Sequence, residues 1–111
     1  MTSRQLSIAR GAWGALLLLA PAVPLRALTG GSEPAGGPTL LRVLGARHVL
    51  QAAATLAAPT AWTLRLGAVA DALHCASGLA FAAVDRRERR AALLDGAVAG
   101  AWAVASVRAA P

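Results

Sequence analysis

The sequence predicts an all-α fold, a four-helix up-and-down transmembrane bundle built as a single domain over residues 1–111. Hydrophobic residues make up 57% of the chain and charged residues only 14%, whereas about a quarter of a soluble domain is charged. Four long apolar segments are separated by short connections, and none sustains the alternation of apolar and polar residues typical of a strand. Four spans of about 20 residues would nearly fill the chain.

The first expected helix covers residues 6–28 and contains a long apolar run. Pro21 and Pro24 are expected to kink or end it, because proline lacks the backbone donor and clashes with the preceding turn. A basic start, including Arg10, followed by a short apolar run is also typical of a secretory signal peptide. No convincing small-x-small cleavage site follows at the right distance, so we expect a retained helix, with cleavage as the alternative.

Glycines, prolines and a run of charged residues mark the connections between the remaining helices. Four glycines and two prolines mark a loop, Pro59-Thr60 supplies a tight turn, and the run DRRERR separates the last two helices. The expected elements are the loop 29–38, helices 39–58 and 61–84, the basic loop 85–90 and a last helix 91–108.

A bilayer suits these helices better than water does. An Arg or Asp at the centre of a spanning helix costs about 2.5–3.5 kcal/mol on insertion scales, so the later segments insert marginally. A soluble bundle, the alternative, needs polar outer faces that these segments lack. We therefore expect a multi-pass membrane protein. Seven arginines against four favour both termini outside.

The pI of about 11.8 raises the question of a nucleic-acid partner. All eleven basic residues are arginine, and they do not form one stripe interleaved with aromatic residues. We therefore expect no nucleic acid among the partners.

One polar cluster is predicted within the membrane-spanning segments. If the second and third helices form an antiparallel hairpin, residues equidistant from its turn lie at similar depth, since each residue rises about 1.5 Å. Arg47, His48 and Gln51 then lie level with the region of Asp71 and His74. Polar residues within a membrane normally face the bundle interior and pair with one another.

Three interpretations of this cluster remain open. The first is a structural clamp in which Arg47 pairs with Asp71 and His48 or Gln51 completes the hydrogen bonds. The second is proton or substrate handling by a small proton-coupled transporter. The third is a metal or cofactor site, or an enzyme, using both histidines and Asp71. That ligand set falls short of the ligand-rich sites of helical bundles, so we expect no metal and no cofactor.

The last helix adds a secondary polar residue and a packing motif. Asp95 is expected to pair with Arg42 or with an arginine of the basic loop. Gly96 and Gly100 form a small-xxx-small face that allows close approach of another helix.

The segments LGARHVLQA (44–52), VADALHCASGL (69–79) and RRERRAALLD (86–95) resemble small four-helix membrane proteins of actinobacteria. The resemblance implies the fold and a multi-pass location in the bacterial inner (plasma) membrane, and no particular activity. The favoured function is that of a non-enzymatic accessory or interaction subunit, packed against itself as a homo-oligomer or within a larger membrane complex.

Overall fold

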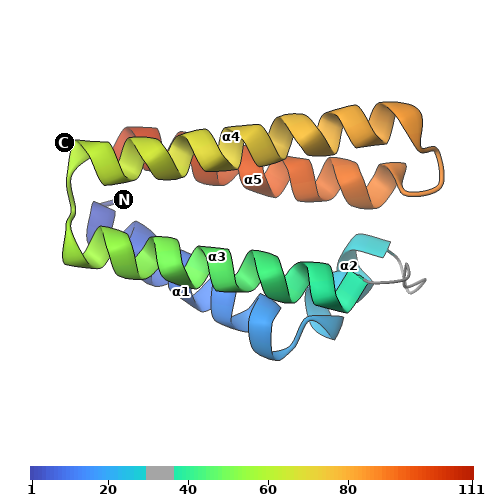
Figure 1. Ribbon diagram of the computed structural model, residues 1–111, viewed down its shortest axis with the longest axis horizontal. Helices are drawn as coiled ribbons and strands as arrows, with labels where there is room; N and C mark the ends of the chain where they lie inside the picture. The colour runs from blue at the N-terminus through green and yellow to red at the C-terminus, as the bar shows by residue number, and fades with distance from the viewer. Residues whose placement is uncertain (30–36) are drawn as a thin grey trace.

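The computed structural model describes residues 1–29 and 37–111, which form helices joined by short connections and contain no strand. The all-α prediction is confirmed, but these residues form five helices rather than four (Figure 1). They are α1 (Ser3–Leu19), α2 (Ala22–Thr29), α3 (Gly37–Ala57), α4 (Ala61–Val84) and α5 (Arg89–Ala109).

The extra helix arises because the predicted helix 6–28 is broken at Pro21. The cap residue Ala20 leaves helical geometry, and α2 restarts at Ala22 with Pro24 in its first turn, where a missing N–H does no harm. The predicted start of α1 was also late, since Thr2 caps the helix with a reciprocal bond pair to Gln5.

The later helices follow the predicted segments closely. The bounds of α4 match the prediction, and Thr60 and Thr63 form a capping box at its start. α5 begins at Arg89 because Asp85 ends α4 and its Oδ1 accepts the N–H groups of Arg87 and Glu88. α3 begins at Gly37, and most of the predicted loop 29–38 lies outside the described residues.

The four long helices are arranged as two antiparallel pairs. α1 packs along α3, α4 packs along α5, and the pairs contact each other less closely (Figure 1). α2 lies at the end of the molecule opposite both chain termini (Figure 1). Its Leu25 packs with Leu17 and Leu41 in an apolar cluster at that end.

Glycines set the spacing within each pair. A Cβ added to Gly14 of α1 would lie 2.8 Å from the carbonyl oxygen of Gly45, and one added to Gly45 of α3 would lie 2.6 Å from that of Gly14. In the second pair, a Cβ on Gly78 of α4 would lie 3.1 Å from the carbonyl oxygen of Ala92 and 3.4 Å from Cα of Gly96. These positions let the helix backbones touch.

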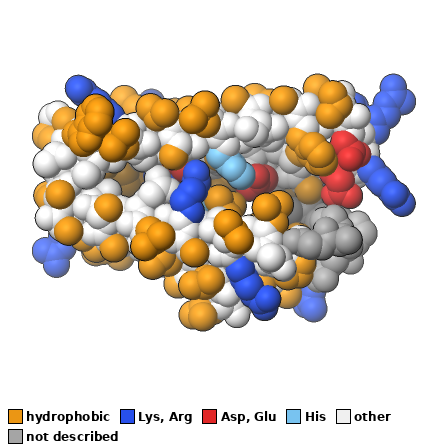
Figure 2. Space-filling model, viewed as in Figure 1, with side chains coloured by type: hydrophobic (Ala, Val, Ile, Leu, Met, Phe, Trp, Pro, Cys, Tyr) orange, Lys and Arg blue, Asp and Glu red, His pale blue; other side chains and the backbone are white. Residues whose placement is uncertain are grey.

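Side chains are distributed differently from those of a soluble bundle. Most large apolar side chains point outward, and Figure 2 shows them along the whole length of one face. The buried residues combine leucines and alanines with Arg10, His48, Asp71 and several hydroxyl residues. Among the described helices, α4 and α5 are long and apolar enough to cross a membrane. The strongly exposed apolar residues include Leu19, Val23, Leu40, Val43, Leu50, Trp62, Leu73, Val84 and Val107.

Candidate functional site

A layer of polar side chains crosses the interior, with one or more contributed by each long helix. On α4 the buried positions follow helical spacing through Leu64, Ala68 and Asp71, so Asp71 occupies a position that an apolar residue would fill in an ordinary core. Arg10 on α1, His48 on α3 and Ser106 on α5 occupy equivalent buried positions on their helices. The layer therefore joins the two helix pairs at a single depth.

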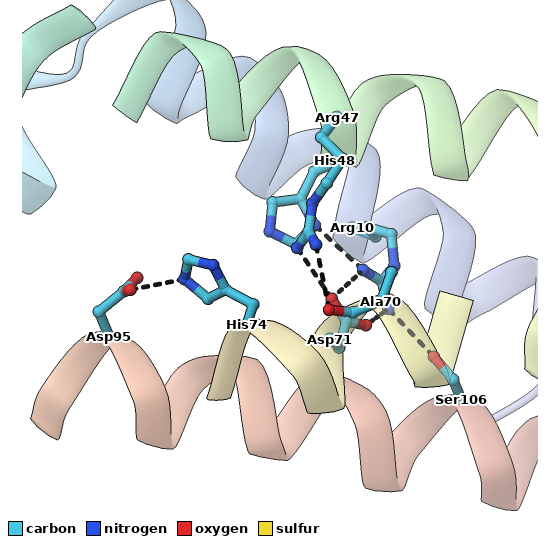
Figure 3. A network of polar contacts seen from close by, with 8 residues as sticks. All are labelled: Arg10, Arg47, His48, Ala70, Asp71, His74, Asp95 and Ser106. Atoms are coloured by element: carbon cyan, nitrogen blue, oxygen red, sulfur yellow. Dashed lines mark hydrogen bonds and ion pairs between the residues drawn. The ribbon is translucent and has the colours of Figure 1, made fainter. Parts of the chain in front are cut away.

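The centre of the layer is a two-pronged ion pair between Arg10 and Asp71 (Figure 3). Arg10 Nη2 donates to Asp71 Oδ2 at 2.6 Å and Nη1 donates to Oδ1 at 3.2 Å. The Asp71 side chain is 0% exposed and that of Arg10 is 5% exposed. A fork-shaped guanidinium matches a carboxylate in this geometry, which makes the pair both strong and directional.

The remaining Arg10 contacts hold the guanidinium from three sides. Nη2 also donates to Ser106 Oγ at 3.0 Å, and the guanidinium carbon lies 4.8 Å from the ring centre of Trp102. Nη1 lies 3.0 Å from His48 Nδ1. Because a guanidinium has no acceptor, Nδ1 must accept here, so the His48 ring is neutral and carries its proton on Nε2. His48 is thereby committed to Arg10.

Arg47 supplies a second cation to the same carboxylate, as the hairpin register predicted. Its Nη2 donates to Asp71 Oδ1 at 3.0 Å, and its Nη1 lies 3.4 Å from the carbonyl oxygen of Ala70. The Arg47 side chain is 30% exposed, so it closes the layer on one side of the molecule. Both oxygens of Asp71 are thus taken by guanidinium groups.

Gln51, predicted within the cluster, lies beside it instead. Its side-chain Oε1 and Nε2 are buried and have no hydrogen-bond partner among the described residues. Gln51 lines a small internal cavity of about 10 Å³ next to Gly67, room for about one water molecule. The other lining residues are Leu6, Ser7, Arg10, Thr55, Thr63, Leu64 and Ser106.

His74, predicted as a member of the cluster around Asp71, forms its ion pair outside that cluster. His74 Nε2 instead lies 2.6 Å from Oδ2 of Asp95 on α5 (Figure 3). Asp95 is therefore paired with a histidine and not with Arg42 or the 85–90 arginines; Arg42 is exposed on α3. Although His74 is one turn from Asp71 on α4, its side chain bonds within the α4–α5 pair.

Gly96 and Gly100 face α4 within the same chain. A Cβ on Gly96 would lie 3.5 Å from the carbonyl oxygen of Cys75, and one on Gly100 would lie 3.4 Å from its Sγ. This small-residue face is therefore occupied by the chain itself. Among residues 1–29 and 37–111, no three His, Cys, Asp or Glu side chains are grouped to hold a metal ion.

Arg10, Ser106 and Trp102 were missed as members of the layer. Arg10 was interpreted only as a flanking charge of the first helix. The signal that could have identified it is the spacing of Leu6, Arg10 and Gly14, which places all three on one buried face of α1.

The chain matches no known protein family, and no similar curated protein or solved structure was found.

Proposed function

We propose that the chain is a multi-pass protein of the bacterial inner membrane that acts as a non-enzymatic accessory or interaction subunit. The observation that carries the proposal is the distribution of side chains: an ion-paired polar layer lies in the interior, and most large apolar side chains lie on the surface. Exposed apolar area of this extent is unfavourable in water, and in a bilayer it faces lipid. Charged residues inside a membrane are expected to pair within the bundle.

The ion pairs also bear on the insertion of α1 and α3. α4 and α5 have the length and hydropathy of membrane spans, whereas α1 and α3 carry Arg10 and Arg47. Because Asp71 pairs with both guanidinium groups, the desolvation of these charges is offset once the two helix pairs are docked. We infer that α1 and α3 are held in the bilayer as part of the assembled bundle.

A structural role for the layer is supported by the engagement of its carboxylate and of the His48 Nδ1 atom. Asp71 has both oxygens bound by arginines, and His48 Nδ1 accepts from Arg10. A catalytic base or acid would need such an atom free to meet a substrate. The layer is therefore best understood as a clamp between the α1–α3 and α4–α5 pairs.

Association with another protein is supported by polar groups left on the surface near mid-depth. The side chains of Arg47, His74 and Asp95 are 30%, 31% and 28% exposed, and Figure 2 shows arginine and histidine side chains in the middle of an apolar face. Lipid tails offer these groups no hydrogen-bond partners. A second protein surface, from another copy or a larger complex, would supply them.

Insertion and orientation can be tested together by single-cysteine labelling. In a Cys75→Ser background, Ser3→Cys and Arg87→Cys place one thiol at each end of the molecule. We expect both variants to stay with membranes after alkaline carbonate extraction. An impermeant maleimide should label Ser3→Cys in intact cells and Arg87→Cys only after permeabilisation, because the arginine-rich 85–90 end faces inward. Release of the chain by carbonate would contradict the proposal.

A second candidate function, a small proton-coupled transporter, is favoured by the unequal polarity of the interior. The half nearer the termini contains Ser7, Thr55 and the unpartnered Gln51 beside Arg10, whereas the other half contains the Leu17–Leu25–Leu41 cluster. Water could therefore reach the layer from one side only. In reconstituted vesicles with a pH-sensitive dye, a transporter would move protons and Gln51→Leu would slow it; a clamp gives no flux in either protein.

A further inference from the structure

We propose that a groove between α4 and α5, at the end of the molecule that holds both termini, binds one anionic phospholipid. The groove has a volume of about 590 Å³ and is formed by apolar side chains with an arginine from each helix. This inference rests on the proposed membrane location. The lining residues are Arg65, Ala68, Val69, Ala72, Ala103, Val104, Val107 and Arg108.

The two arginines give the groove its charge preference. Neither Arg65 nor Arg108 has an ion-pair partner among the described residues, and both are exposed. The acidic side chains that the structure describes lie elsewhere: Asp71 and Asp95 are paired inside the bundle, and Asp85 and Glu88 lie in the connection at the opposite end. A phosphate here would meet two unneutralised guanidinium groups, which bind phosphate oxygens well.

The depth of the groove suits a lipid whose headgroup is at the membrane surface. Trp62 is 69% exposed one turn before Arg65, the place at which interfacial tryptophans anchor spanning helices. From Arg65 the groove continues to Ala72, a rise of about 10 Å along α4. With the lipid phosphate at the two arginines, an acyl chain would therefore lie along the alanines and the exposed Val69 and Val104, toward the middle of the membrane.

Charge also argues against a second copy as the occupant. A symmetric contact through this groove would bring two Arg65 and two Arg108 side chains together with no acidic partner nearby. Like charges facing each other across an interface oppose association. An anionic lipid satisfies the arginines and the apolar lining at once.

The test is native mass spectrometry of the full chain in detergent, with added phosphatidylglycerol or phosphatidylcholine of the same acyl chains. We expect phosphatidylglycerol to form the more abundant one-to-one complex. Arg65→Gln/Arg108→Gln should weaken that complex by roughly 30-fold and each single change by roughly fivefold, because each arginine near a lipid surface contributes comparably. Binding of phosphatidylcholine should stay unchanged.

Two controls distinguish binding in the groove from the general attraction of anionic lipid to a basic protein. Arg4→Gln/Arg26→Gln removes the same charge from exposed positions outside the groove and should leave binding unaltered. Ala72→Trp fills the groove and should reduce binding with both arginines present. Equal loss in the two double variants, equal binding of both lipids, or a dimer in place of a lipid complex would overturn the inference. Carbonate extraction of the same variants reports separately on membrane insertion.

Discussion

Arg10 and Asp71 are 61 positions apart in the sequence, yet their side chains meet through two hydrogen bonds between α1 and α4. This contact closes the interface between two helix pairs that otherwise pack less tightly against each other than within themselves. Arg47 and Ser106 bring α3 and α5 into the same network. The stability of the whole molecule should therefore depend on one carboxylate.

Loss of the Asp71 charge should be strongly destabilising. Asp71→Asn leaves two guanidinium groups without their counter-charge, and removal of one partner from a buried ion pair costs about 3–5 kcal/mol. Arg47→Gln should cost about 1 kcal/mol, because this side chain is partly exposed and Arg10 retains the carboxylate. Thermal unfolding of the purified protein in detergent measures both. Equal losses of stability in the two variants would contradict the conclusion that the Arg10–Asp71 pair contributes most of the stability of the layer.

Replacement of all three charges should restore much of that loss. In Arg10→Met/Arg47→Met/Asp71→Leu no buried charge is left unpaired, and buried ion pairs are often replaced by apolar residues without loss of stability. We expect the unfolding temperature of the triple variant to exceed that of Asp71→Asn and to approach that of the parent. If the parent transports protons, the triple variant separates the roles, since it would be folded and inactive. A triple variant less stable than Asp71→Asn would contradict the clamp.

Two glycines on α1 should respond oppositely to alanine. At Gly14 the added Cβ would lie 2.9 Å from His48 Cβ as well as close to the α3 backbone, so α1 and α3 must separate. We expect a loss of about 1–3 kcal/mol, typical of overpacking. At Gly11 the Cβ would lie 3.5 Å from Ala52 Cβ, an ordinary contact, and alanine should be neutral or stabilising because it favours the helix. Unfolding measured side by side distinguishes them; similar losses would refute the close crossing.

The sequence predicted the bounds of the helices better than it predicted the contacts between side chains. The bounds of α4 follow from local chemistry: Thr60 caps the helix, and its apolar run ends at Asp85. The contact between Arg47 and Asp71 follows from counting residues away from a tight turn. Both depend on neighbours in the sequence or on a single hairpin, which is why they could be anticipated.

The contacts of Arg10 and His74 depend on how helices are rotated in three dimensions. Arg10 lies on the face of α1 that reaches Asp71 of α4, and the rotation of α1 about its axis is set where it crosses α3 at the Gly14–Gly45 contact. His74 shares a side of α4 with Asp71, but a modest rotation about the helix axis directs it to Asp95. Hairpin register fixes depth along a helix and leaves this rotation undetermined.

The division of charge between the two halves of the chain has a consequence for how they recognise each other. Within the polar layer, the α1–α3 half carries both cations and the α4–α5 half carries the single carboxylate. Two α1–α3 halves brought together would set guanidinium against guanidinium, and two α4–α5 halves would leave a carboxylate without any cation. The α1–α3 half therefore pairs with the α4–α5 half and not with a copy of itself, because their charges are opposite and their shapes fit.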